Sequence, residues 1–324
     1  MRVSGLTKRG LVLTVAVTVA LTAASAVAQA APFSVVAVYG DSLSDNGNLF
    51  RASNQPGPPY FEGRRSDGPV AVEKLAAALG APLLDFAWLG ATTGIGNIAD
   101  GGTPTGAGAF SLPGMQVEFA QSQASLGPYL NDGLFVVWGG ADDFLSPSPL
   151  DLTPQAIISR AIANELGIVT SLALLGARNI LVPGLPDLGL TPFFRSLGPA
   201  AAAQASAATD VFNLALRARL PSGVFFYDTA GLVRSISAQP GAYGFTNVTD
   251  ACFDGTTVCA DPSTYLFFDS FHPTTAAATL AAQGFLSTVA PAAVPEPGTL
   301  WLLGCGMAVA AAHRWRSRRE QPAR

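Results

Sequence analysis

Short apolar runs alternate along most of the chain with longer stretches that carry hydrophobic residues at helical spacing. The short runs are rich in β-branched and aromatic residues, which is typical of buried strands. Five of them cover residues 35–39, 83–89, 134–138, 179–183 and 223–227. Because strands that alternate with helices favour a parallel sheet with helices on both faces, this pattern predicts an α/β fold.

The stretches between these runs predict the helices. Val72, Leu75 and Leu79 lie on one face of a segment at helical spacing. Pro69 fits the first turn of this helix, and Gly80 ends it. Further helices are expected over residues 115–126, 153–175 and 200–220, and an apolar, alanine-rich helix after residue 274.

The first 30 residues have the pattern of a signal peptide. Basic residues precede an apolar run over residues 11–27, and Ala28-Gln29-Ala30 is a small-x-small cleavage site. A membrane anchor is the alternative, but the small residues at its end and the polar chain that follows favour cleavage. We therefore expect a signal peptidase to remove residues 1–30 as the chain crosses the inner membrane of a bacterium.

Composition narrows the possible partners. The chain has 324 residues, of which 49% are hydrophobic and 12% charged, and a net charge of −4. Residues 31–290 are enough for one α/β domain. Away from the two ends there is no basic run, so we expect no nucleic-acid partner. The glycine-rich stretch 94–108 contains neither a dinucleotide fingerprint nor a phosphate loop with a lysine, so we expect no cofactor.

Candidate chemistry begins where the first predicted strand ends. Gly40 is followed by Asp41 and Ser42, and a serine just beyond a buried strand lies where open α/β sheets bind ligands. A polar loop would also fit these residues, whereas a serine nucleophile requires a base elsewhere in the chain. The chain has two histidines, His272 and His313. Because His313 lies in a basic tail, the base would have to be His272.

Asp269 lies three residues before His272. One turn can bring its carboxylate beside the imidazole, where it would fix the tautomer and stabilise the imidazolium. A histidine with only a structural role is the alternative. The sequence predicts Ser42 as nucleophile, His272 as base and Asp269 as the orienting carboxylate, and we expect no metal site.

These residues resemble the GDSL esterases and lipases of the SGNH-hydrolase superfamily. Gly40-Asp41-Ser42-Leu43 matches the first family block, and Asp269-x-x-His272 matches the last. The intervening blocks correspond to residues 85–93 and 136–144, so the resemblance covers about residues 35–289. It implies a three-layer α/β/α fold with a central parallel five-stranded sheet, in flavodoxin-like order with the second strand outermost. It also implies hydrolysis of carboxylic esters through an acyl-enzyme.

The resemblance further implies an oxyanion hole formed by Ser42, Gly90 and Asp142. The backbone N–H groups of Ser42 and Gly90 would each contribute about 10²–10³ in rate. The family has asparagine where this chain has Asp142. An ionised carboxylate has no proton to donate and would repel the oxyanion.

Two states of Asp142 are physically open. Burial beside Asp143 would raise the pKa of Asp142 and keep a neutral acid that donates. A partly wet position would leave Asp142 ionised and the esterase slow. We favour the ionised state from the sequence, for which Asp142→Asn raises kcat by roughly 10-fold or more.

Because Asp142 replaces the asparagine of the family, a second function class also remains open. A weakly active or non-catalytic surface module that binds acylated glycans or lipids would tolerate Asp142. For an enzyme, short-chain esters, lysophospholipids and acetyl groups on exopolysaccharide all fit as substrates, because the sequence identifies neither the acyl group nor the alcohol.

Cys252 and Cys259 flank a short turn in a chain that we expect to be exported. An oxidising compartment favours a local disulfide between them. A metal pair is the alternative, but no histidine or further cysteine lies nearby to complete a site. The disulfide would brace the loop that leads to Asp269 and His272.

Residues 291–324 form a separate signal. A Pro-Glu-Pro segment at residues 295–297 precedes an apolar run over residues 299–312 and an arginine-rich tail. The run is shorter than the roughly 20 residues of an ordinary spanning helix, and the positive charges should stay cytoplasmic. A simple tail anchor is the alternative reading.

The tripartite pattern resembles the PEP-CTERM sorting signal of Gram-negative bacteria, which implies processing by an exosortase and an association with extracellular polysaccharide. We expect a protein of the cell envelope or outer surface, or a secreted one, transiently anchored in the inner membrane by a short transmembrane helix.

Overall fold

The computed structural model describes residues 33–289, so the expected signal peptide and sorting segment lie outside the described residues. A five-stranded parallel sheet forms the centre of the domain, with the strand order β2-β1-β3-β4-β5. This confirms the predicted α/β class and the outermost place of the second strand. The strands are β1 (Val36–Gly40), β2 (Leu83–Asp85), β3 (Leu134–Trp138), β4 (Asn179–Pro183) and β5 (Phe225–Tyr227).

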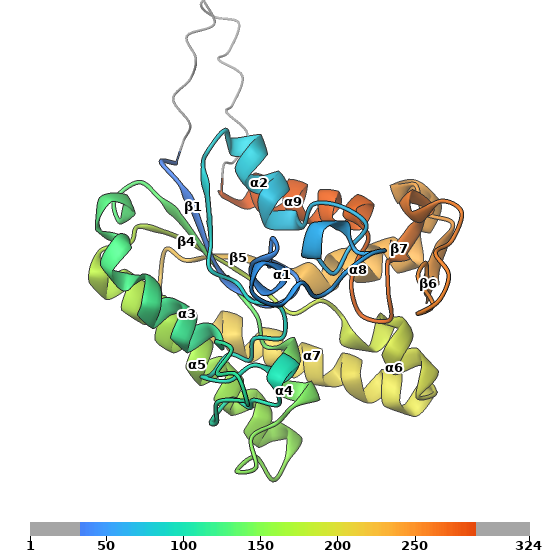
Figure 1. Ribbon diagram of the computed structural model, residues 1–324, viewed down its shortest axis with the longest axis horizontal. Helices are drawn as coiled ribbons and strands as arrows, with labels where there is room; N and C mark the ends of the chain where they lie inside the picture. Colours follow the sequence, from blue (N-terminus) through green and yellow to red (C-terminus); the bar gives the residue numbers. More distant parts are fainter. Residues whose placement is uncertain (1–32, 290–324) are drawn as a thin grey trace, which may run out of the picture. The chain divides into compact units, whose positions relative to one another are not determined.

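Helices cover both faces of the sheet (Figure 1). They are α1 (Asn48–Ser53), α2 (Ala71–Leu79), α3 (Met115–Ser122), α4 (Ala141–Leu145), α5 (Pro154–Leu175), α6 (Pro192–Ser196), α7 (Pro199–Arg219), α8 (Thr229–Ala238) and α9 (Thr275–Val289). Side chains of β1 alternate between the faces. Ala37 and Tyr39 belong to the core beneath α3, α5 and α7, whereas Val36 and Val38 pack with α2 and α9.

Helix α5 has the length and apolar composition of a membrane span. Its inner face is nevertheless part of the domain core, because Ile162, Val169 and Leu172 are buried against the sheet. Thr153 caps its first turn, where the Thr153 side chain accepts a hydrogen bond from the backbone N–H of Ala156. Helix α5 is therefore a core helix of this domain.

Two predicted boundaries were wrong. The second strand ends at Asp85 rather than near residue 89, and the Asp85 carboxylate accepts the backbone N–H of Ala87 at 3.0 Å just beyond this end. Pro69 precedes α2 instead of starting it. The N-cap position belongs to Val70, whose N–H donates to the Glu73 carboxylate at 2.9 Å.

A subdomain that the sequence pattern did not indicate lies beside the sheet. The parallel pair β6 (Asn247–Ala251) and β7 (Tyr265–Phe267) packs near α8, which contributes Val233 and Ile236 to a third hydrophobic cluster. The side chains of β6 are partly or fully exposed, so this segment lacks the apolar alternation that marks a strand. The loop after β7 carries Asp269 and His272, so this subdomain positions half of the candidate site.

Candidate active site

Ser42 lies in a tight turn at the carboxyl end of β1. A Cβ added at Gly40 would lie 2.4 Å from the carbonyl oxygen of Trp138, so the close approach of β3 requires glycine there. The N–H groups of Ser44 and Asp45 donate to the carbonyl oxygen of Asp41 at 3.0 and 2.9 Å. The turn directs Ser42 to the edge of the sheet where the strands end.

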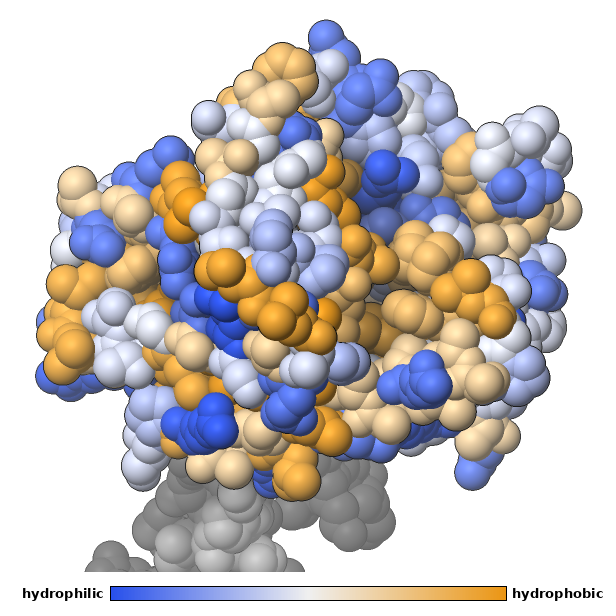
Figure 2. All heavy atoms as spheres, turned by 90° about the horizontal axis from the view of Figure 1, so that it is seen from below, coloured by the Kyte–Doolittle hydropathy of each residue, from blue (hydrophilic) through white to orange (hydrophobic). Residues whose placement is uncertain are grey.

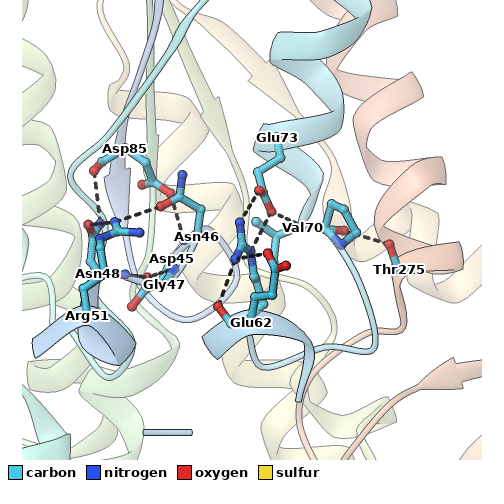
Figure 3. Close-up of polar contacts among 12 residues, drawn as sticks. Asp45, Asn46, Gly47, Asn48, Arg51, Glu62, Val70, Glu73, Asp85 and Thr275 are labelled. Carbon is cyan, nitrogen blue, oxygen red and sulfur yellow. Dashed lines mark hydrogen bonds and ion pairs between the residues drawn. The ribbon is translucent and has the colours of Figure 1, made fainter. Parts of the chain in front are cut away.

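The turn is tied to the segment that carries Gly90. Asp45 accepts the backbone N–H of Leu89 at 2.7 Å, and the Asn48 amide donates to the carbonyl oxygen of Asp85 at 3.0 Å. Figure 3 shows Asp45, Asn48 and Asp85 at this junction. Gly90 follows with a φ of 82°, a conformation that favours glycine. These bonds hold the two predicted backbone donors, Ser42 and Gly90, in one framework.

The structure brings the three candidate catalytic residues together. His272 Nε2 lies 2.8 Å from Ser42 Oγ, across a separation of 230 residues. On the other side of the ring, His272 Nδ1 lies 2.8 and 2.9 Å from the two carboxylate oxygens of Asp269. This is the hydrogen-bond order of a serine nucleophile, a histidine base and an orienting carboxylate.

Asp269 is surrounded by donors. Its Oδ1 accepts the backbone N–H groups of Phe271 and His272 at 2.9 and 2.8 Å, and its Oδ2 accepts the Tyr60 hydroxyl at 2.8 Å. Burial by itself would raise the pKa of Asp269, but the His272 ring and the backbone donors lower it below its usual range. Asp269 is therefore ionised at neutral pH.

Sequence reasoning missed Tyr60 and Arg65. The Arg65 guanidinium donates to the Tyr60 hydroxyl at 3.0 Å and lies 4.8 Å from the centre of the Tyr60 ring. Burial and the Asp269 charge raise the pKa of Tyr60 to about 12, so its hydroxyl remains a donor. The sequence offered one signal for Tyr60. It lies in a proline-rich loop over residues 50–63 that follows the first strand, and loops that follow strand ends often carry binding or catalytic residues.

Asp142 is buried, and the expectation of a partly wet position was wrong. The residue is 6% exposed, and Oδ2 has no hydrogen-bond partner within residues 33–289. The residue follows β3, the middle strand of the sheet, so segments after β1 and β4 flank it. Burial raises the pKa of Asp142 well above its usual range, and the carboxyl groups of Asp41 and Asp143 raise it further.

These two neighbours are themselves buried acids. Asp41 accepts the N–H of Leu43 at 2.9 Å, and burial raises its pKa to about 6. Asp143 accepts the N–H and the hydroxyl of Thr93 at 2.8 and 2.7 Å, and burial raises its pKa to about 7. No positive side chain forms an ion pair with either acid within the described part of the chain.

A pocket of about 440 Å³ opens above Ser42, which we call the mouth. Gly90, Asp142 and His272 line it together with Ser42. Figure 2 views the side to which the carboxyl ends of the strands point, and shows hydrophobic residues along both sides of a hollow. The site residues from four separate segments therefore face one pocket.

The loop between β6 and β7 borders the mouth. A disulfide joins Cys252 and Cys259 in this loop. Phe253, which directly follows Cys252, lines the mouth and donates its N–H to the carbonyl oxygen of Phe268 at 2.6 Å. The cross-linked loop is therefore hydrogen-bonded to Phe268, the residue directly before Asp269.

Comparisons with known proteins identify the family of this chain. The GDSL-like Lipase/Acylhydrolase family model matches residues 36–285, and the PEP-CTERM protein-sorting motif matches residues 293–319. A phosphatidylcholine-sterol acyltransferase of Aeromonas hydrophila is 31% identical over 259 residues, which cover 74% of this chain and 71% of the relative. Esterase EstA of Pseudomonas aeruginosa is 30% identical over 294 residues, which cover 75% of this chain and 45% of EstA.

Among solved structures, an acetylxylan esterase from Geobacillus stearothermophilus is similar with a TM-score of 0.42 and 14% identity, over 79% of this chain and 94% of that one. The family match extends over most of the chain and includes all four blocks of the site. The chain therefore belongs to the GDSL-like lipase/acylhydrolase family and is a carboxylic-ester hydrolase that carries a PEP-CTERM sorting motif.

Proposed function

We propose that this enzyme cleaves esters through an acyl-enzyme on Ser42, with His272 as the base and Asp269 as its orienting partner. The supporting observation is the unbroken hydrogen-bond series from Ser42 Oγ through both ring nitrogens of His272 to the Asp269 carboxylate. His272 accepts the Ser42 proton as Oγ attacks the ester carbonyl, and returns it to the leaving alcohol. A water then repeats the attack on the acyl-enzyme with His272 again as base.

The oxyanion is stabilised by three donors in this proposal. Two are the backbone N–H groups of Ser42 and Gly90, and the third is the neutral carboxylic acid of Asp142. The burial of Asp142 between two other acids, with Oδ2 unpaired in the described region, supports a protonated side chain. A carboxylic acid then supplies the proton that asparagine supplies in the family.

Substitution of the nucleophile and the base tests the mechanism. Ser42→Ala and His272→Ala should each lower kcat on p-nitrophenyl acetate by about 10⁴-fold or more, with an unchanged circular dichroism spectrum. Ser53→Ala is the matched control, because Ser53 lies on exposed α1, away from the mouth. Near-normal activity of His272→Ala would contradict the proposal.

In this proposal the two ends of the chain determine where the enzyme is located. A signal peptidase removes residues 1–30, an exosortase-type enzyme processes residues 291–324, and the domain of residues 31–290 acts at the cell envelope or outside it. The sorting motif at residues 293–319 supports the second step. Deletion of residues 295–324 should release soluble, active enzyme, and loss of folding would contradict the division.

A further inference from the structure

We propose that the acyl chain of the ester enters a second, apolar cavity behind Ser42 and His272, and that the enzyme prefers short acyl chains. We call this space the inner cavity. The proposal rests on the proposed acyl-enzyme mechanism, because it assigns the part of the substrate that stays attached to Ser42. It identifies the substrate class that the sequence left open.

The inner cavity lies where the second and third hydrophobic clusters meet. Helices α8 and α9 form two walls, and the start of α2 forms a third. Ser42 and His272 line both this cavity and the mouth, as do Leu43 and Phe271. The two spaces therefore meet at the nucleophile. The apolar wall of the inner cavity includes Val70, Ala71, Val233, Ile236, Ala278 and Ala281.

Most polar side chains at the wall are bonded to other groups. Asp187 pairs with Arg234 at 2.6 Å, and the Ser66 hydroxyl donates to the carbonyl oxygen of Pro273 at 2.9 Å. The Thr191 hydroxyl donates to the carbonyl oxygen of Leu188 at 2.6 Å. Thr229 and Arg65 are the exceptions, because the Thr229 hydroxyl and the Arg65 Nε are buried and have no partner in the described residues. An aliphatic chain would gain from burial against such a wall, whereas a sugar would lose hydrogen bonds to water.

The order of the chemical steps assigns the acyl group to this cavity and the alcohol to the mouth. The alcohol must leave first, and a water must then reach Ser42 and His272. The acyl group remains bonded to Ser42 throughout. The inner cavity is much smaller than the mouth, at about 60 Å³ against about 440 Å³, and its wall is mainly apolar. A narrow apolar space suits the group that stays, and the wider mouth suits the group that must exchange.

The size of the cavity limits the chain length. The inner cavity has a volume of about 60 Å³. A water-sized sphere needs about 10–15 Å³ of such volume, so roughly four to six of them fit. A methylene group is close to a water molecule in size. We therefore expect acyl chains of about four to six carbons to fit, and long-chain lipids to fit poorly.

The test compares acyl-chain profiles of purified full-length enzyme and two opposite variants. Wild type should show its highest kcat/KM between p-nitrophenyl butyrate and hexanoate. Ala278→Leu fills the cavity from α9, so it should lower kcat/KM on hexanoate by about 10-fold or more and change that on acetate by less than about threefold. Gln283→Leu is the control, because Gln283 is exposed on the same helix and should keep the wild-type profile.

Val233→Ala enlarges the cavity from α8, so it should move the optimum towards octanoate. This second variant keeps the test decisive if Ala278→Leu does not fold. If the wild type hydrolyses none of these esters, the proposed function itself fails. If it hydrolyses them but the variants keep the wild-type profile, only the acyl assignment fails. A changed preference among alkyl acetates, with the acyl profile unchanged, would assign the alcohol to the inner cavity and also overturn the proposal.

Discussion

Two of the carboxyl groups that border the mouth lie in environments with opposite effects on their charge. Asp269 and Asp142 are equally buried, with 6% of each residue exposed. Asp269 receives hydrogen bonds from two backbone N–H groups, the Tyr60 hydroxyl and the His272 ring, and its pKa is lowered. Asp142 has an unpaired Oδ2 among the described residues and two acidic neighbours, and its pKa is raised.

The comparison shows that burial does not by itself determine the charge of an acid. Desolvation raises the pKa of both side chains, and the partners decide which state results. Donors around Asp269 stabilise the anion, which then orients His272. Acidic neighbours around Asp142 stabilise the neutral acid, which in the proposed mechanism donates a hydrogen bond to the oxyanion. In the proposed mechanism, aspartate therefore serves two different roles in a single pocket.

The largest expected effect comes from removing the charge at Asp269. Asp269→Asn should lower kcat on p-nitrophenyl butyrate by about 10⁴-fold, because the amide cannot stabilise the imidazolium and favours the wrong tautomer. Steady-state kinetics of the folded variant measure this loss. A loss below about tenfold would mean that other groups orient His272, and the role proposed for the Asp269 charge would be wrong.

Asp142 is expected to give the next largest effect. Asp142→Ala should lower kcat by about 10²–10³-fold, the contribution of one oxyanion donor. Asp142→Asn should stay within about threefold of wild type in mildly acid solution, because one neutral donor replaces another. It should also keep its activity at higher pH, where ionisation of Asp142 should lower the activity of the wild type.

The pH profile of kcat for wild type and Asp142→Asn distinguishes the two states of this side chain. A protonated Asp142 predicts a bell-shaped wild-type profile whose alkaline limb moves upward in the variant. A uniform increase of about 10-fold in Asp142→Asn at every pH would instead show that Asp142 is ionised and repels the oxyanion.

A smaller effect on kcat is expected at Tyr60, which tests how the charge of Asp269 is stabilised. Tyr60→Phe removes one of the donors to Asp269, so it should lower kcat by about 10-fold and move the acid limb of the pH profile upward. Tyr129→Phe is the control, since Tyr129 lies outside the mouth and the inner cavity. An unchanged acid limb would show that Tyr60 has no part in holding the charge of Asp269.

The smallest effect concerns stability. Burial raises the pKa of Asp41 to about 6 and that of Asp143 to about 7, so the folded state binds more protons than the unfolded state above about pH 4. The stabilisation that these two acids contribute to the folded state is complete below the usual carboxyl pKa. It is lost as the pH rises through their raised pKa values. The melting temperature should therefore fall by several degrees between about pH 5 and pH 7.5.

Glu165→Gln supplies the matched variant for this measurement. Glu165 is fully buried, both of its carboxyl oxygens lack partners in the described residues, and burial raises its pKa well above the usual range. The neutral amide should flatten the decline in melting temperature with pH. Asp269 has the opposite sign, because its lowered pKa contributes stability that is lost in strong acid. A melting temperature that rises from about pH 5 to pH 7.5 would contradict the assignment of the raised acids.

The sequence alone determined the sheet, because five short apolar runs must be buried and alternate with amphipathic helices. It also singled out Ser42, Asp269 and His272, since the chain has two histidines and one of them lies in a basic tail. The structure brings these three side chains into hydrogen-bond contact, and their catalytic roles remain predictions. Local spacing was sufficient for this much because a strand end, a three-residue interval and a scarce residue type are all readable along the chain.

The tertiary structure decided the environment of each group. The burial of Asp142 depends on the segments that flank the end of β3, and the Tyr60 bond to Asp269 spans 209 residues. The inner cavity exists because α8, α9 and the start of α2 leave space between them. Charge state and cavity size are properties of the surroundings of a residue, and surroundings made of distant segments leave no periodic pattern in the sequence.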